Sequence, residues 1–403
     1  MTTTINNEHK KLNVPNLRFP EFQGEWKKTK FGDIATGFDY GMNAAAKNYD
    51  GVNKYIRITD IDEASSTYTD KDIVSPDGIL TDNYLVNNRD ILLARTGAST
   101  GKSYLYKQSD GKLYYAGFLI RANVTTHDPY FVFSQLHTHR YWRWVSIMSA
   151  RSGQPGINSQ EYSSFPIYIT SIEEESKIAK LLSLLDERIA TQNKIIEDLK
   201  KLKSAIIERH YNQAEKQTVF IADLGKPFNV GNLSKDDLSE TGKPCIIYGE
   251  LFTTYEETIS QVESHTNKKE GMTLSKKGDL LFPTSTTVDA ISLIAPSVIN
   301  VDGVILGGDM FGIHISTNFN AQYLSYYFNH IANRQLAKFA KGSTIIHLHY
   351  TDIENAKLLL PSLEEQNKMA NCLISLDEKI RVEKSYLQLL DKQKAYLLRQ
   401  MFI

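Results

Sequence analysis

An internal repeat constrains the fold of this chain more than any other feature, because a duplicated sequence folds as copies of one unit. The segment Ser171-Ile-Glu-Glu-Glu-Ser-Lys-Ile-Ala179 matches Ser362-Leu-Glu-Glu-Gln-Asn-Lys-Met-Ala370 at an offset of 191 residues, with no gap from 157 to 211. Further upstream, Asp90-Ile-Leu-Leu matches Asp279-Leu-Leu-Phe with a small change of offset. Between these landmarks the two halves differ greatly. The chain is therefore predicted to contain two copies of one architecture with two different surfaces.

The end of each repeat is predicted to be a long helix. Its apolar residues recur at alternating spacings of three and four, which is the pattern of a coiled-coil seam. The shared register favours an antiparallel pair of these two helices, and the alternative is that each helix packs only on its own domain. At about 35 residues, each helix would be roughly 50 Å long. The predicted seam consists of Leu182, Leu185, Ile189, Ile196, Leu199, Ile206, Leu373, Leu376, Ile380, Leu387, Leu390 and Leu397.

The globular part of each half is predicted to be α/β (α+β). Short apolar runs indicate strands, and one amphipathic helix follows in each half. The first helix begins at Asp128-Pro129, an N-cap followed by proline, and the second begins at Asn320. The strand candidates are 54–58, 90–94 and 117–121 in the first half, and 245–248, 279–282 and 312–315 in the second.

These patterns divide the 403 residues into five predicted segments. Two globular domains are each followed by a long helix, and a short polar linker joins the halves. The predicted bounds are 15–164 for the first domain, 165–211 for the first helix, 212–219 for the linker, 220–356 for the second domain and 357–403 for the last helix.

Composition narrows the class of protein. Two cysteines, Cys245 and Cys372, fit neither a disulfide framework nor a zinc-ligand spacing, so a reducing cytoplasm is expected. No apolar stretch approaches the roughly 18 residues that a membrane span needs, so no membrane partner is expected. The net charge of -1 argues mildly against a free-standing nucleic-acid binder. That objection is weak if the basic groups cluster on one face, or if partner subunits complete the groove.

One loop resembles a phosphate-binding motif. In Thr96-Gly-Ala-Ser-Thr-Gly-Lys-Ser103, threonine occupies the position where the motif needs glycine, and the residues that follow look extended. Without a helix N-terminus the phosphate cradle is missing. We therefore favour a polar turn between two strands, and a loop that touches DNA is the next interpretation. A nucleotide-dependent hydrolase stays as an alternative function.

Other motifs also receive structural interpretations. The pairs His137/His139 and His347/His349 lack a clear third metal ligand, so no metal site is predicted. Glu175-Ser-Lys177 lacks the partners of a nuclease motif and is interpreted as charge on a solvated helix face. Arg140-Tyr-Trp-Arg-Trp144 is interpreted as core aromatics with solvated arginines, although such mixtures can also bind nucleic acid. No catalytic residue is predicted.

Several segments together resemble the DNA-specificity subunits of type I restriction–modification systems. Pro15-Asn-Leu-Arg-Phe-Pro-Glu-Phe22, with Trp26 and Gly32-Asp-Ile34 after it, resembles the opening of these subunits. Asp90-Ile-Leu-Leu-Ala-Arg-Thr-Gly-Ala98 and Pro244-Cys-Ile-Ile-Tyr-Gly-Glu-Leu251 are similar to recurrent segments of their target-recognition domains.

The segment Pro361-Ser-Leu-Glu-Glu-Gln366 resembles the opening of the conserved helical region of the same family. The first copy departs from it, with Thr170 in place of proline and Glu175 in place of glutamine. The resemblance covers almost the whole chain, and the order, duplication and spacing of the motifs are specific.

The resemblance implies two target-recognition domains held apart by an antiparallel coiled coil. It also implies the partners: double-stranded DNA with a bipartite target, two modification (methyltransferase) subunits, and restriction (motor–nuclease) subunits. The chain itself would hold no cofactor, while its partners would use S-adenosylmethionine, ATP and Mg. A coiled-coil scaffold or adaptor protein is the non-enzymatic alternative.

Base reading needs hydrogen-bonding side chains on loops, and phosphate contacts from Lys, Arg, Ser and Thr fix the register on DNA. For each candidate, a surface or structural role is the competing interpretation. The candidate DNA-binding residues are Arg57, Thr59, Arg95, Thr96, Ser99, Lys102, Gln154, Asn158, Tyr248, Thr254, Thr284, Ser285, Thr286, Ser343, Thr344 and His347.

Overall fold

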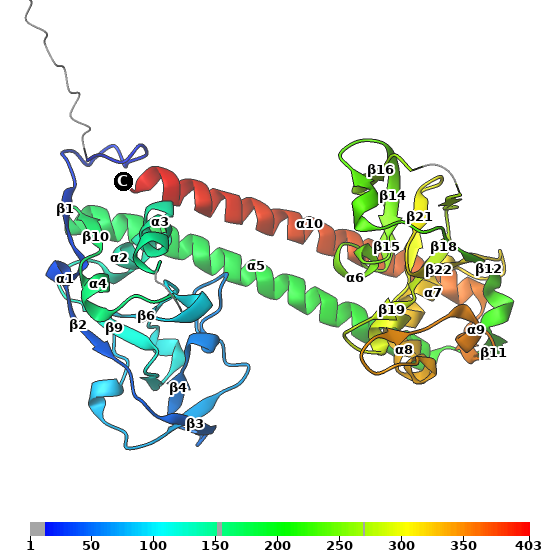
Figure 1. Ribbon diagram of the computed structural model, residues 1–403, viewed down its shortest axis with the longest axis horizontal. Helices are drawn as coiled ribbons and strands as arrows, with labels where there is room; N and C mark the ends of the chain where they lie inside the picture. Colours follow the sequence, from blue (N-terminus) through cyan, green and yellow to red (C-terminus); the bar gives the residue numbers. More distant parts are fainter. Residues whose placement is uncertain (1–12, 151–154, 269–270) are drawn as a thin grey trace, which may run out of the picture. The chain divides into compact units, whose positions relative to one another are not determined.

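The computed structural model describes residues 13–150, 155–268 and 271–403, and it divides into two compact units (Figure 1). Unit 1 contains the described residues up to Lys194 together with Lys384–Ile403, and unit 2 contains Ile195–Glu383. Each unit therefore combines one globular domain with a segment from each of the two long helices, α5 (Ile172–Gln213) and α10 (Leu363–Met401).

The globular part of unit 1 is built on a four-stranded sheet of order β2-β9-β6-β7. The two central strands, β6 (Asp90–Ala94) and β9 (Leu119–Val124), are antiparallel, and all five residues of β6 are buried. A continuous apolar run is typical of such a fully buried strand. The other unit 1 strands are β1 (Lys27–Lys30), β2 (Ala35–Tyr40), β3 (Ala45–Asn48), β4 (Lys54–Ile56), β5 (Val74–Asp77), β7 (Ser103–Leu105), β8 (Leu113–Tyr115) and β10 (Pro166–Ile169).

The helices of unit 1 pack on this sheet and on the long helices. Buried Ile91 and Ile120 of the sheet share one apolar cluster with Phe131, Tyr141 and the α5 residue Leu182. The short helices of this unit are α1 (Phe31–Ile34), α2 (Pro129–Gln135), α3 (His139–Met148) and α4 (Ser159–Ser163).

Unit 2 contains two five-stranded sheets, of orders β12-β22-β18-β20-β15 and β13-β16-β14-β21-β17. In the first, β18 (Asp279–Pro283) and β22 (Met310–Ile315) are antiparallel, like β6 and β9 of unit 1. The other strands are β11 (Gln217–Phe220), β12 (Gly225–Asn229), β13 (Leu238–Ser239), β14 (Lys243–Ile247), β15 (Thr258–Ile259), β16 (Ser264–Thr266), β17 (Thr273–Leu274), β19 (Ser285–Thr286), β20 (Ser297–Ile299), β21 (Ile305–Gly307), β23 (Ile346–His347) and β24 (Lys357–Leu360). The short helices are α6 (Glu250–Thr253), α7 (Ala321–Tyr327), α8 (Asn333–Leu336) and α9 (Tyr350–Ile353).

The α/β architecture is confirmed, and both predicted helix starts are correct. The Asp128 carboxylate caps α2 by accepting from the N–H groups of Tyr130 and Phe131, and Asn320 caps α7 by accepting from Tyr323. The prediction of a single helix in each half is wrong, because α3 follows α2 in the first half and α8 follows α7 in the second. Thr138 accepts from the N–H of Tyr141 and so starts a second helix, α3.

The long helices differ in length from the prediction. They have 42 and 39 residues, which corresponds to roughly 60 Å at about 1.5 Å per residue. The predicted linker is also more ordered than expected, because α5 continues to Gln213 and β11 begins at Gln217. Among the described residues, no helix has the length and apolar character to cross a membrane.

Candidate nucleic-acid interface

The structure brings together two predicted DNA-binding segments at the end of β6. The carbonyl of Arg95 accepts a hydrogen bond of 2.9 Å from the N–H of Ile157, and the N–H of Gly97 donates to Pro155 at 3.0 Å. The loop after β6 therefore lies against the loop that precedes α4. Arg95 and Thr96 therefore come close to Asn158, although more than fifty residues separate Asn158 from them in the sequence. Gln154 lies outside the described residues.

The same pairing recurs at the end of β18 in unit 2. Ser285 pairs with His347 and Thr286 with Ile346 in the short ladder of β19 and β23, and the N–H of Leu348 donates to Thr284 at 2.9 Å. The repeat therefore brings equivalent pairs of loops together in both units, although the residues on them differ.

In each unit, the turn before the next central strand lies beside the loop pair; that strand is β9 in unit 1 and β22 in unit 2. The register of β6 and β9 continues past their last pair, so that Phe118 lies opposite Arg95, and the Arg95 N–H donates to the Phe118 carbonyl at 3.1 Å. In unit 2, the N–H of Thr284 donates to Asp309 at 2.8 Å in the corresponding place. One backbone position in each unit thus carries a different side chain, Phe118 or Asp309.

Arg95 differs from the other predicted DNA-binding cations because it has no carboxylate partner among the described residues. Its guanidinium lies 4.6 Å from the centre of the Tyr40 ring. Stacking on an aromatic ring holds an arginine in place. One guanidinium N–H of Arg95 also donates to the Gly117 carbonyl at 3.4 Å, and its remaining N–H groups stay available. Sequence reasoning missed Phe118 because it assigned 117–121 wholly to a strand, and it missed Tyr40 because it proposed no strand before residue 54.

Two other predicted cations are already engaged. The Arg57 guanidinium lies 2.8 Å from Asp60 and 3.0 Å from Asp72, and the hydrogen bond with Asp60 is the main cause that raises its pKa. The Lys102 ammonium lies 3.0 Å from Glu63. Contact with DNA would require these groups to exchange a carboxylate for a phosphate. Thr59 is exposed next to Arg57 and points its hydroxyl at Asp60, at 3.4 Å.

The loop that resembles a phosphate-binding motif forms a polar turn. A short 3-10 turn, Gly97–Ser99, follows β6, and β7 begins at Ser103, so a strand stands where a phosphate loop has a helix. The Thr100 hydroxyl donates to the carbonyl of Gly97 at 2.8 Å. The interpretation as a turn between two strands is therefore correct, and a phosphate cradle is not formed.

Several predicted DNA-binding residues of unit 2 are buried within the loops. Thr284, Ser285 and Thr286 are buried, and the Ser285 hydroxyl donates to the Asp309 carboxylate at 2.8 Å. Such burial leaves them little surface for a partner. The predicted residues that stay at least partly exposed in this unit are Tyr248, Thr254, Ser343, Thr344 and His347.

Asn158 also has a structural role in unit 1. Its side chain caps α4 by accepting from the N–H of Glu161 at 2.9 Å, while Ser99 stays partly exposed in the turn.

In unit 2, Thr284 and His347 line a surface cavity of about 580 Å³ together with Asp309 and Lys341. The rings of His347 and His349 stack at 6.4 Å. Among the described residues, no group of three His, Cys, Asp or Glu side chains is placed to hold a metal ion.

Two interpretations of charged motifs are wrong in part: Lys177 and Arg143 are exposed as expected, but Glu175 and Arg140 are not. Glu175 does not lie on a solvated face: it is buried and accepts from the N–H groups of Asp128 and Thr170, at 3.1 and 3.0 Å. Burial raises the pKa of this carboxyl group. Arg140 is not solvated either, because its guanidinium donates to the Pro166 carbonyl at 2.8 Å and stacks on Tyr168 at 4.7 Å, and burial lowers its pKa.

In the second repeat, Gln366 replaces Glu175 without loss of its role. Its side-chain oxygen accepts from the N–H of Asn320 at 3.0 Å, as Glu175 accepts from Asp128. Each of these side chains thus ties the start of a long helix to the start of the short helix in its own domain.

The residues of the predicted coiled-coil seam are shielded from solvent in both units. Every one of its twelve residues is buried or partly buried. In unit 1, Leu182 and Leu185 of α5 share a cluster with Leu390 and Leu397 of α10. In unit 2, Lys203 is ion-paired to Asp377, and His210 lies 3.4 Å from Glu365. Lys203 precedes His210 along α5, whereas Asp377 follows Glu365 along α10, so the two helix segments of unit 2 are antiparallel.

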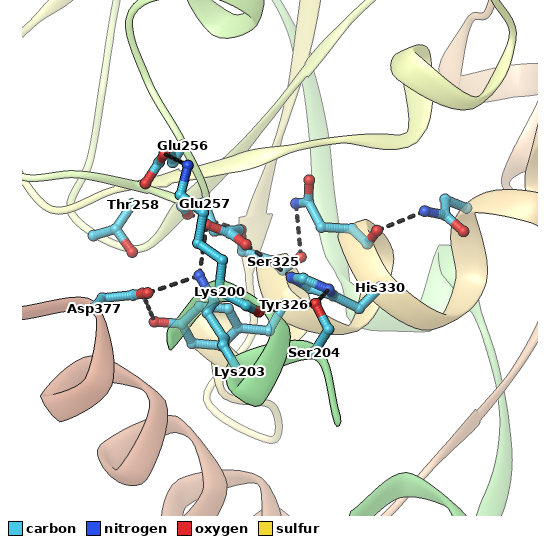
Figure 2. Close-up of polar contacts among 12 residues, drawn as sticks. Lys200, Lys203, Ser204, Glu256, Glu257, Thr258, Ser325, Tyr326, His330 and Asp377 are labelled. Atoms are coloured by element: carbon cyan, nitrogen blue, oxygen red, sulfur yellow. Dashed lines mark hydrogen bonds and ion pairs between the residues drawn. The ribbon is translucent and has the colours of Figure 1, made fainter. Parts of the chain in front are cut away.

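A buried ionic network accompanies these contacts in unit 2, and Figure 2 shows Lys203 at its centre. The Lys203 ammonium lies 2.9 Å from Glu257 and 2.7 Å from Asp377. His330 binds the other oxygen of Glu257 at 2.9 Å, and the Tyr326 hydroxyl donates to Asp377 at 2.5 Å. Burial alone would lower the pKa of Lys203, but the two carboxylates raise it above its ordinary value. The network therefore stays charged and ties α5, α10 and the second domain together within unit 2.

Two copies of one α/β domain, with different side chains on equivalent loops, define a class of tandem recognition protein. The family model for the type I restriction modification DNA specificity domain matches this chain twice, over residues 23–201 and 213–392. The chain therefore belongs to the family of type I restriction–modification specificity subunits.

Individual relatives agree with this assignment. The chain is 24% identical to the type I restriction enzyme MjaVIII specificity subunit of Methanocaldococcus jannaschii, over 94% of this chain and 91% of the relative. It is 23% identical to the putative MjaX specificity subunit of the same organism, over 96% and 95%.

Solved structures share the fold. The crystal structure of the type I restriction–modification S subunit from M. genitalium matches with a TM-score of 0.60 and 14% identity, over 97% of this chain and 99% of that one. A chain from a study of complex assembly and conformational transition of the type I R-M system matches with a TM-score of 0.55 and 14% identity, over 94% and 97%.

Proposed function

We propose that this chain is the non-catalytic DNA-reading subunit of a type I complex, in which each globular domain reads one half of a bipartite target. The observation that carries the proposal is the duplicated loop pair at the ends of β6 and β18. The same backbone contacts hold Arg95 with Phe118 in one unit and Thr284 with Asp309 in the other. Equal scaffolds with unequal side chains suit the reading of two unlike half-sites by base contacts.

The partners follow from the family. Two methyltransferase subunits would use S-adenosylmethionine to methylate adenine in the target, and motor–nuclease subunits would use ATP and Mg to translocate and cut DNA. This chain would supply the sequence preference and no cofactor, and the assembly would work in the cytoplasm. The family match and the strand after the 96–103 loop make the nucleotide-dependent hydrolase a weaker proposal. A coiled-coil adaptor without DNA binding is also weaker, because the match covers both globular domains.

The experiment that tests this function is a genomic map of N6-methyladenine. Cells that express this chain with its methyltransferase partner are compared with cells that lack only this chain. We expect one bipartite motif, two short specified blocks around an unspecified gap, to be methylated in the first cells and unmethylated in the second. An unchanged methylome with the partner expressed would contradict the proposal, and DNA and ATP binding by the purified chain would then separate the alternatives.

A further inference from the structure

Phe118 is an exposed aromatic residue that the fold of unit 1 holds in a fixed place. It lies in a tight turn in which the Leu119 N–H donates to the Ala116 carbonyl at 2.8 Å, and the Gly117 N–H donates to Met42 at 2.8 Å. Gly41 packs against the same turn so closely that an added Cβ would lie 2.2 Å from the Ala116 oxygen. The turn is therefore rigid, although its aromatic side chain is 63% exposed.

The neighbours of Phe118 include a residue that the sequence predicts to bind DNA. Arg95 lies directly opposite Phe118 in the continued register of β6 and β9. Residues directly opposite in an antiparallel pair point to the same face, with their Cβ atoms about 5 Å apart. Tyr40 carries the Arg95 guanidinium on its ring and is itself 43% exposed. Two exposed aromatic residues thus contact Arg95, Tyr40 through its ring and Phe118 through its backbone carbonyl.

The strand that carries Tyr40 is irregular at this place. The register of β2 against β9 shifts between Gly37 and Asp39, and Phe38 between them has a φ of 58°. A β-bulge of this kind re-aims the side chains that follow it and is common beside functional sites. Here it precedes Tyr40 by two residues.

We propose that Phe118 is a specificity-determining residue of the first domain, and that it contacts the 5-methyl group of a thymine next to the base read by Arg95. This inference rests on the proposed function. Arginine pairs with guanine through O6 and N7, and an apolar side chain recognises the thymine methyl group on the same major-groove edge. Two side chains about 5 Å apart match neighbouring bases, which are roughly 3.4 Å apart along a strand.

Unit 2 supports this assignment by contrast. The equivalent turn position holds Asp309, whose backbone makes the same contact to Thr284. One oxygen of the Asp309 carboxylate accepts from the Ser285 hydroxyl, and the other is suited to accept from the N4 amino group of cytosine. A carboxylate cannot recognise a methyl group. The same scaffold position would therefore select different bases in the two half-sites.

The test uses the complete complex of this chain with its methyltransferase partners, and duplexes that carry the mapped target. Each thymine of the half-site read by domain 1 is replaced in turn by deoxyuridine, which lacks only the 5-methyl group. We expect the wild-type complex to methylate one of these duplexes about fourfold more slowly, as expected for the loss of one buried methyl group. Phe118→Ala should methylate the thymine and deoxyuridine duplexes at one equal, reduced rate.

Two further variants separate methyl recognition from other roles. Phe118→Leu keeps an apolar side chain but removes the ring, so it should keep the preference for thymine. Val52→Ala removes an equally exposed apolar side chain, 63% exposed, from a loop outside this cluster and should behave as the wild type.

Three results would overturn the inference. They are a wild-type complex that is indifferent to deoxyuridine at every position of that half-site, a Phe118→Ala variant that keeps the preference, and a Phe118→Leu variant that loses it. The last result would indicate stacking on a base. A wild-type complex that methylates no target sequence would instead contradict the proposed function on which the inference rests.

Discussion

The Lys203 ammonium of α5 lies 2.7 Å from the Asp377 carboxylate of α10. A second ion pair joins the repeat counterparts of these two residues, with the lysine on α10 and the aspartate on α5. Lys394 and Asp186 lie 2.7 Å apart, and each is the repeat counterpart of one residue in the first pair, at the offset of 191 residues. A segment of α5 and an antiparallel segment of α10 therefore meet in the same way in both units. In the part of the chain that the structure describes, a second carboxylate, Glu257, is added to the lysine in unit 2 alone.

Replacement of Lys203 should destabilise the protein more than replacement of its counterpart. The side chain of Lys203 is 6% exposed and neutralises two carboxylates, whereas Lys394 is 23% exposed and pairs with one. Lys203→Met should cost about 3 kcal/mol, because Glu257 and Asp377, which are largely buried, would lose the cation that they share. Lys394→Met is the matched control and should cost about 1 kcal/mol. Urea unfolding followed by circular dichroism measures both, and equal losses would contradict the prediction.

Glu257 should make stability depend on pH in acid. Burial would raise the pKa of this carboxyl group, but His330 and Lys203 outweigh burial and lower the pKa to about 2, from an ordinary value of 4.5. A depressed pKa stabilises the folded state above pH 4.5, and that contribution falls as the pH drops toward 2. The slope is at most about 1.4 kcal/mol per pH unit.

The matched variant for this effect is Glu257→Gln, which keeps the shape of the side chain but does not titrate. Its urea midpoint should be lower than that of the wild type at pH 7, and the difference should shrink between pH 4.5 and pH 2. A difference that stays constant over this range would show that the carboxylate is not held ionised by its partners.

Removal of Arg95 should weaken base recognition, whereas removal of Arg57 should lower stability. Arg95→Ala should reduce methylation of the target about 5- to 100-fold and relax the preference at one base, because a bidentate base contact is lost. Arg57→Ala should lower the urea midpoint, because buried Asp60 loses its ion pair, while the base preference stays unchanged. Methylation rates on duplexes with single base changes distinguish the two, and a relaxed preference in Arg57→Ala would refute this division.

Exchange of residues 15–160 for another reader domain should change one half of the methylated motif and leave the other half and its partners intact. The reason is that the loop pair of unit 2 is built wholly from residues 284–349. Mapping of N6-methyladenine measures the outcome, and a change in both halves would rule out independent reading.

Charge in the seam should prevent assembly. Leu185 is buried and Leu376 partly buried, so Leu185→Asp with Leu376→Asp would place unpaired carboxylates against apolar residues. We expect loss of the complex with methyltransferase subunits in gel filtration, and loss of methylation. The exposed neighbours Leu184 and Ile374 provide the control pair, whose replacement should leave the fold of this chain intact.

The repeat, the α/β class, the helix starts at Asp128 and Asn320 and the periodic seam all follow from the sequence, because each depends on local patterns: spacing, capping and apolar runs. Tertiary structure decided which polar side chains stay available. Lys102 and Glu175 look like any other charged residues in a sequence, but their partners Glu63 and Asp128 lie 39 and 47 residues away. Arg57 likewise adds Asp72, 15 residues away, to its near neighbour Asp60. Phe118 became a candidate for the same reason: the register of β6 and β9 places it opposite Arg95. Pairing between distant strands leaves no periodic mark on the chain, so only the folded molecule shows which side chains meet.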